Sequence, residues 1–162
     1  MPAPPSAASR DRIHSVVLGG EALTRLSPIQ EADRQQATAD LAAENAFTLA
    51  RHSGPYVLHL SIQEGRLVFD VHGLDDAPIA AIVLALGPFR RLLKDYQMLV
   101  DSHILAVEEG REARIQAIDM GRRGLHNEGA ALMIERLHGK VTIDFETARR
   151  LFTLVCVLHQ RI

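Results

Sequence analysis

The sequence predicts an α+β fold in which a small antiparallel β-meander packs against a long central helix and a buried C-terminal helix. Three patterns support this fold class. Residues 56–72 alternate apolar and polar side chains with the two-residue period of a β-hairpin. Residues 88–109 repeat apolar side chains at helical spacing along one stripe. Residues 145–159 are apolar on nearly every side, which is typical of a helix inside a core.

The chain has the composition of a soluble globular protein, with 162 residues of which 47% are hydrophobic and 23% charged. A net charge of −2, an aromatic content of 4% and the lack of tryptophan argue against nucleic-acid binding. The longest apolar run, residues 79–86, is too short to cross a bilayer as a helix. Residues 1–9 lack the apolar segment of a signal peptide. We therefore expect a cytoplasmic protein that contacts neither nucleic acid nor membrane.

The N-terminal part of the chain is predicted to hold a tail, a strand and a helix. Residues 1–11 are rich in Pro, Ala and Ser and are expected to be a disordered tail before a single α+β domain over residues 12–162. A short strand is predicted for residues 14–18. Residues 27–30 combine a Ser N-cap, a Pro at the first helical position and a Gln three residues after the cap. They therefore predict a helix that begins here and ends near Ala46.

The β-meander is predicted from three consecutive runs. Residues 56–62 and 67–71 form a hairpin around the turn at residues 63–66. After a turn over residues 73–78, the continuous apolar run of residues 79–86 predicts a third strand that is more deeply buried.

A long helix is predicted for residues 88–109, and Gly110 ends it. Its apolar stripe comprises Phe89, Leu92, Leu93, Tyr96, Leu99, Val100, His103 and Val107. We interpret His103 as a core histidine. A shorter helical stretch is predicted for residues 112–119.

The C-terminal part is predicted to form a helix over residues 130–137 and a short strand over residues 140–143. Asp144 would cap a final helix over residues 145–159. Cys156 lies in the apolar run of that helix and is expected to be an inert core thiol.

Residues 118–129 are interpreted as a glycine-rich loop that binds an anion. Its three glycines permit close approach of the backbone to a ligand, and the start of the next helix would point N–H groups into the same space. Its arginines could hold a phosphate or a carboxylate. The predicted ligand-binding residues of the segment are Gly121, Arg122, Arg123, Gly124 and Asn127. The alternative is a structural loop in which Asn127 caps the next helix and the arginines pair with carboxylates.

Two further arginine pairs, Arg90-Arg91 and Arg149-Arg150, lie in the opening turns of predicted helices. Positive charge there opposes the helix macrodipole, and a bound anion or nearby carboxylates such as Asp144 and Glu146 would relieve that conflict. We therefore include these four arginines among the candidate ligand-binding residues. The hypothesis is that all three pairs converge in a basic pocket, and the alternative is a set of surface ion pairs.

Acid–base chemistry is a weaker interpretation of the same segment. His126, Glu128 and Asp119 are its weak catalytic candidates, because an imidazole titrates near neutral pH. The segment contains no Ser or Cys nucleophile, and it matches neither the P-loop nor the dinucleotide fingerprint. Whether the chain is an enzyme is left open, and the cofactor is unknown.

The predicted hairpin also raises the question of a metal. With a two-residue turn, His59 faces Asp70 directly and His72 lies diagonally on the same side. Two imidazoles and a carboxylate are a common ligand set of non-haem metal centres. A cross-strand hydrogen bond explains the pair equally well, so no metal is predicted.

Five segments of the chain form a familiar combination: Leu67–Asp70, Pro88–Arg91, Lys94–Tyr96, Ala117–Gly129 and the ending from Asp144 to His159. Together they resemble one bacterial family, uncharacterised protein family 0262, over about residues 12–160. The family has no established activity, so the resemblance implies kinship and not chemistry. Its pattern includes no histidine at positions 59 and 72, which counts against the metal interpretation.

We expect a non-enzymatic cytoplasmic module that binds an anionic small molecule or an acidic partner surface. One alternative is a small hydrolase or phosphoryl-transfer enzyme that uses His126 as general base, and another is a structural or homo-oligomeric interaction protein. An enzyme requires His126 to be exposed in a concave site. A structural motif requires each arginine to be paired with a carboxylate and no cavity between them.

Overall fold

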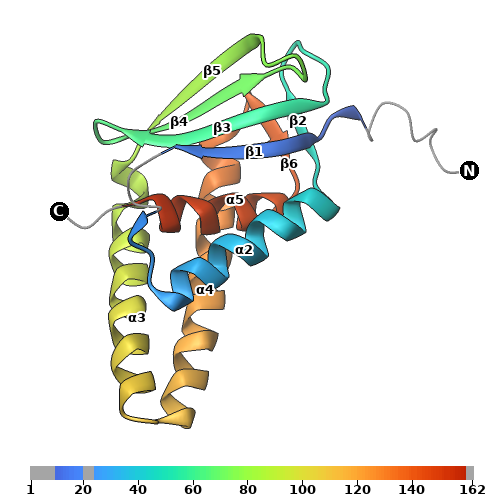
Figure 1. The fold of residues 1–162 in the computed structure, drawn as a ribbon. Coiled ribbons are helices and arrows are strands. Elements are labelled where there is room, and N and C mark those ends of the chain that lie inside the picture. Colours follow the sequence, from blue (N-terminus) through green and yellow to red (C-terminus); the bar gives the residue numbers. More distant parts are fainter. Residues whose placement is uncertain (1–9, 20–23, 160–162) are drawn as a thin grey trace, which may run out of the picture.

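The computed structural model describes residues 10–19 and 24–159. Its main sheet has four strands in the order β1, β3, β4, β5 (Figure 1). Their bounds are Ile13–Gly19, Tyr56–Gln63, Arg66–His72 and Pro78–Ala85. Strands β3, β4 and β5 form the expected antiparallel meander, and β1 adds a parallel strand beside β3. The predicted α+β fold class is confirmed, whereas the tail expected over residues 1–11 lies almost wholly outside the described residues.

Strand β5 is more exposed than its apolar run predicted. It lies at the edge of the sheet, its only buried residues are Ile82 and Leu84, and Val83 is 46% exposed. An antiparallel sheet buries one face in the core and presents the other face to solvent. The prediction of a deeply buried strand was therefore wrong.

A second, two-stranded sheet joins β2 (Phe47–Leu49) to β6 (Val141–Ile143) in antiparallel register. The strand at β6 was predicted. The strand at β2 was not, because three residues are too few for a two-residue period to stand out.

Helix α2 spans Pro28–Ala43 and begins at the predicted capping box. The Ser27 hydroxyl accepts a hydrogen bond from the Gln30 N–H at 3.4 Å, and the Gln30 side-chain oxygen accepts one from the Ser27 N–H at 2.9 Å. The helix ends three residues before the predicted Ala46, because the chain must straighten to enter β2.

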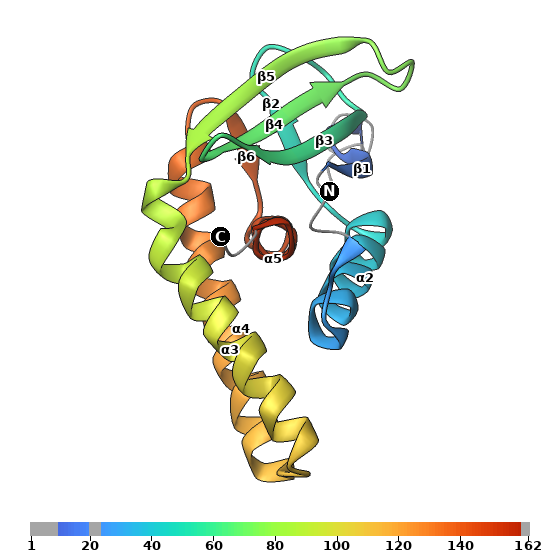
Figure 2. The same cartoon turned by 60° about the vertical axis from the view of Figure 1, so that its left-hand side comes forward.

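Helices α3 (Arg90–Glu108) and α4 (Glu112–Leu137) form an antiparallel hairpin whose far end extends beyond the rest of the molecule (Figures 1 and 2). A short 3-10 turn precedes α3. Val107, which the apolar stripe placed in the core, is 53% exposed. It lies near the far end of the hairpin, where no further element is packed against it.

Helix α4 corrects the interpretation of the glycine-rich segment, which is not a loop but the interior of one continuous helix. Each glycine weakens a helix by roughly 1 kcal/mol relative to alanine, so packing must compensate. A Cβ on Gly129 would lie 2.2 Å from the Phe152 ring, which shows that this glycine permits close contact between α4 and α5. Asn127 lies inside the helix and is not an N-cap. The backbone N–H groups of a helix interior bond within the helix and are unavailable to an anion.

Helix α5 (Phe145–Leu158) forms the centre of the core, as predicted. Asp144 caps it by accepting a hydrogen bond from the Thr147 N–H at 3.2 Å. In Figure 2, α5 lies beneath the sheet with α4 on one side and α2 on the other. Cys156 is buried in this helix, and burial raises the pKa of its thiol, as expected for an inert core cysteine.

Candidate functional site

A polar cavity of about 340 Å³ opens between α2, α4 and α5. Helix α5 lies between the other two helices (Figure 2), and side chains from all three line the cavity. The lining residues are Asp33, Gln36, Ala37 and Asp40 from α2, Arg122, Arg123 and His126 from α4, and Arg149, Arg150 and Thr153 from α5. The volume is that of a site for a small metabolite.

The cavity brings together two of the three arginine pairs singled out in the sequence. Arg122 and Arg123 follow one another on α4, and Arg149 and Arg150 lie in the second turn of α5. Because α4 packs against α5, pairs that are far apart in sequence face the same space. Four guanidinium groups therefore meet in a protein whose net charge is −2.

The third arginine pair does not reach the cavity. Arg91 instead contacts Asp95 and Glu128, each at 3.3 Å. The predicted ligand-binding residues that lie outside the lining are Arg90, Arg91, Gly121, Gly124 and Asn127. Gly121 faces α3, since a Cβ there would lie 3.6 Å from Leu99.

Two carboxylates also line the cavity, those of Asp33 and Asp40. Asp33 is buried and accepts a hydrogen bond from the Tyr96 hydroxyl at 2.7 Å, while Arg122 Nε lies 3.6 Å from its other oxygen. Burial raises the pKa of Asp33, and the Tyr96 hydrogen bond and the Arg122 charge oppose that rise. The lining thus contains four arginines and two carboxylates.

Each arginine of the lining has a carboxylate neighbour. The distances are 2.5 Å for Arg122–Asp119, 3.6 Å for Arg123–Asp119, 3.2 Å for Arg149–Glu146, 3.7 Å for Arg150–Glu146 and 3.8 Å for Arg150–Asp40. A purely structural motif was expected to combine such pairing with a closed interior. Here the pairing coexists with an open polar cavity.

His126 lines the cavity as a buried, neutral imidazole. Only 5% of the residue is exposed, and its ring packs between Tyr96 and Phe152, with ring centroids 5.9 Å and 6.4 Å away. Burial, followed by the charges of Arg122 and Arg149, lowers the pKa of His126 to about 4. The ring is therefore uncharged at neutral pH.

Two buried polar atoms of the lining lack a hydrogen-bond partner. They are His126 Nε2 and Arg150 Nε, and the described part of the chain has only one other such side-chain atom, His72 Nε2. Buried polar groups without partners are rare, and each calls for an explanation such as a missing water or ligand. Their presence in one cavity marks this site as the strongest candidate in the described structure.

The three weak catalytic candidates do not assemble at this site. Asp119 and Glu128 do not line the cavity, and they contact Arg122 and Arg91 respectively. A general base works best when its pKa lies near the operating pH, and the pKa of His126 is well below it. His126 therefore has neither the exposure nor the pKa expected of a general base.

A model of the uncharacterised protein family UPF0262 matches residues 10–161. The chain belongs to this family. It is 67% identical to the UPF0262 protein of Granulibacter bethesdensis, over 98% of this chain and 95% of the relative. Identity is 61% with the Acidiphilium cryptum protein, over 96% of this chain and 97% of the relative, and 46% with the Rhodospirillum rubrum protein, over 93% and 94%. No solved structure matches the chain.

Sequence reasoning missed the α2 wall of the site in this UPF0262 chain. Asp33, Gln36 and Asp40 repeat at helical spacing, so a polar stripe on one face of α2 was the available signal. Sequence analysis did not single out this stripe, because nothing local indicates that α2 packs beside α5.

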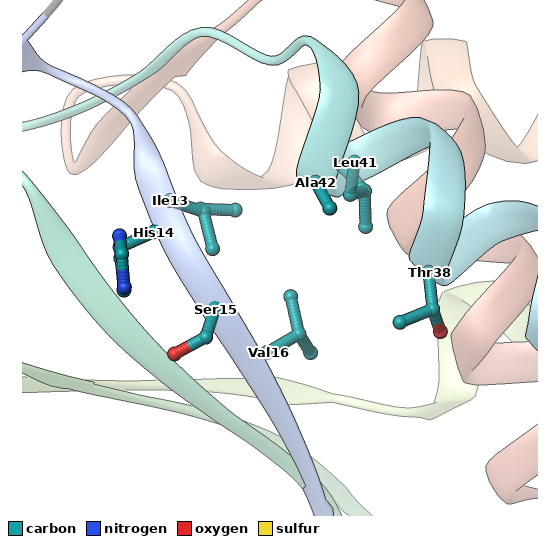
Figure 3. Close-up of a pocket in the computed structure, with 7 residues that line it drawn as sticks. All are labelled: Ile13, His14, Ser15, Val16, Thr38, Leu41 and Ala42. Carbon is teal, nitrogen blue, oxygen red and sulfur yellow. The ribbon is translucent and has the colours of Figure 1, made fainter.

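A second hollow of the UPF0262 chain lies between β1 and α2, with a volume of about 140 Å³ (Figure 3). Ile13 and Val16 face α2 across it, whereas His14 and Ser15 point away from the helix. Polar groups therefore do not converge in this hollow, which makes it a poorer candidate.

Within residues 10–19 and 24–159, no helix is long and apolar enough to cross a membrane.

The histidines considered for a metal lie on β3 and β4, outside the cavity lining. His59 pairs with Asp70 across the hairpin, as the two-residue turn predicted. His72 lies beside His59, with their ring centroids 4.1 Å apart.

Proposed function

We propose that this UPF0262 chain binds a small anion, such as a phosphorylated or carboxylated metabolite, in the cavity between α2, α4 and α5. The observation that supports this proposal is the pair of buried nitrogens without a hydrogen-bond partner, His126 Nε2 and Arg150 Nε, in a cavity lined by four arginines. Arg150 Nε donates a hydrogen bond, and an anionic oxygen is its natural acceptor. His126 Nε2 would contact a second polar atom of the same ligand.

The arginine–carboxylate contacts support a binding site whose arginine side chains are already positioned. Asp119 and Glu146 neutralise part of the arginine charge at distances between 2.5 and 3.7 Å. An incoming phosphate or carboxylate offers the guanidinium groups stronger, bidentate hydrogen bonds. Binding without turnover fits the neutral, buried state of His126.

The test compares ligand binding in two matched arginine variants. Arg123→Ala removes an exposed guanidinium of the lining, and Arg91→Ala removes an exposed guanidinium outside it. Each of these arginines contacts at least one carboxylate. Purified protein is titrated with inorganic phosphate, phosphorylated metabolites and dicarboxylates by thermal shift and calorimetry. A ligand at a hundred times its Kd stabilises a fold by about 2.7 kcal/mol, which raises Tm by roughly 5–10 °C at this size.

We expect Arg123→Ala to weaken binding by roughly 10- to 100-fold, the value of one or more charge-assisted hydrogen bonds. Arg91→Ala should bind as the natural chain does. An equal loss of affinity in both variants would point to a general charge effect. Unchanged binding by Arg123→Ala would exclude the cavity as the binding site. If Arg123→Ala instead destabilises the ligand-free protein by much more than the ~1 kcal/mol of a surface pair, the arginines serve the fold.

A further inference from the structure

We infer that the outer face of the main sheet carries a site for a divalent transition-metal ion, formed by His59, His72 and Asp76. One candidate ligand atom from each residue lies within 4.8 Å of the others. Among the described residues, this is the one group of three such side chains that meets that geometry. The site is separate from the anion cavity, whose lining contains none of these residues.

The backbone places the three side chains from three consecutive elements. His59 lies on β3, His72 is the last residue of β4, and Asp76 lies in the turn before β5. The register of β4 against β5 shifts next to His72, and such irregularities change the direction in which side chains point. The turn is held by hydrogen bonds from the Gly73 N–H to the Ala77 carbonyl and from the Asp76 N–H to the Gly73 carbonyl, both 3.0 Å.

The turn also fixes the backbone of Asp76 in the left-handed region, with φ of 64°. Few residues other than glycine adopt this conformation, although Asp and Asn tolerate it better than most. Non-glycine residues held in sparsely populated conformations are concentrated at functional sites. Here the conformation carries the carboxylate to the two imidazoles.

The distances between the ligand atoms suit a small ion. Asp76 Oδ1 lies 3.0 Å from His59 Nε2 and 2.8 Å from His72 Nδ1. In a tetrahedral zinc site with bonds of about 2.0–2.1 Å, ligand atoms lie about 3.3 Å apart. Both distances from Asp76 Oδ1 are a few tenths of an ångström shorter than that spacing.

Asp70 provides the supporting contact that metal-bound histidines usually have. His72 Nε2 lies 3.1 Å from Asp70 Oδ2, in a geometry that leaves this buried nitrogen without a proper hydrogen bond. A metal-ligating histidine typically donates its other ring N–H to a carboxylate, which fixes the orientation of the ring. With the metal on Nδ1, the Nε2–H of His72 would be directed at Asp70. Asp70 is thus a positioning residue, and solvent would supply the remaining ligand on the exposed side.

The test is calorimetric titration of Zn²⁺ into the full chain, freed of any affinity tag and of metal by chelation. We expect one equivalent to bind to the natural chain. His59→Gln, His72→Gln and Asp76→Asn should each abolish that binding, and Asn keeps a residue that tolerates the backbone of Asp76. Asp70→Asn should retain the stoichiometry and lower the affinity by roughly 10- to 100-fold.

Matched controls are Asp75→Asn in the same turn and His138→Gln at an exposed position elsewhere. Both should bind Zn²⁺ as the natural chain does. The absorption spectrum of the Co²⁺ form gives a second readout, since nitrogen and oxygen ligands in tetrahedral geometry produce an intense visible band. A natural chain that binds no Zn²⁺, or binding that survives His72→Gln and Asp76→Asn, would overturn the proposal and leave a hydrogen-bonded His–Asp–His cluster.

Discussion

His126 shows how a single side chain can make the fold sensitive to acid. Its imidazole is buried between two aromatic rings and faces the charges of Arg122 and Arg149. A proton on this ring would add a positive charge where burial and two cations disfavour it. The protein therefore holds the ring neutral at pH values where an exposed histidine is already charged.

We predict that the contribution of His126 to stability is lost as the pH is lowered from about 6.5 to 4. Over this range the unfolded chain binds a proton at His126 and the folded chain does not, so protonation favours unfolding. The pKa of about 4 corresponds to a loss of up to about 3 kcal/mol. Urea unfolding at a series of pH values measures the slope. His126→Gln should flatten it, whereas His138→Gln, at an exposed position, should not.

Gly129 is the position where an added methyl group has the clearest consequence. The Cβ of an alanine there would lie 2.2–2.4 Å from atoms of the Phe152 ring, far inside contact distance. We expect Gly129→Ala to lower the free energy of unfolding by about 1–3 kcal/mol, the usual effect of overpacking a core, despite the better helix propensity of alanine. Denaturant unfolding monitored by circular dichroism measures the change.

Gly124 is the matched control within the same helix. No atom lies within 4 Å of a Cβ added there, so Gly124→Ala brings only the gain in helix propensity. We expect it to stabilise the protein by roughly 0.5–1 kcal/mol. Equal effects of the two substitutions would mean that α4 and α5 are not packed as described.

At the scale of elements, local patterns predicted those parts whose neighbours are close in sequence. The hairpin of β3 and β4, the capping box of α2 and the apolar α5 all form from residues within one or two consecutive elements. Alternation and capping depend on backbone geometry alone, so they can be seen in a short window of sequence.

Helix α4 could not be predicted in the same way, because its glycines are explained by another element. Three glycines in nine residues resemble a loop as long as the Phe152 ring that packs on Gly129 is unknown.

The candidate sites also depend on contacts between elements. The arginines were recognised as unusual from the sequence, but the α2 wall of the cavity and the contribution of Asp76 to the histidine cluster depend on contacts between elements.

At the scale of the molecule, the proposed anion cavity has walls from helices that are far apart in sequence. A ligand bound there would contact α2, α4 and α5 at once, whereas β4 and β5 contribute nothing to the lining. Local openings that separate these helices would then require ligand release.

We therefore predict that a saturating anion slows amide hydrogen exchange in the three helices and leaves the β4–β5 edge of the sheet unchanged. Exchange measured by mass spectrometry with and without the ligand tests this pattern. If the proposed metal site is correct, Zn²⁺ should slow amide exchange in the turn between β4 and β5 and not in the three helices. Uniform protection by either ligand would contradict two independent sites.

The position of α5 also affects the fate of incomplete chains. This helix is the last one along the described chain, yet it packs against α2, α4 and β3 and buries ten of its fourteen residues. A chain cut or stopped before Phe145 would contain every other helix and the whole main sheet, but their apolar inner faces would have nothing to cover them. Such fragments would expose the surfaces that chaperones and proteases recognise. Only a chain that includes α5 can bury these apolar surfaces.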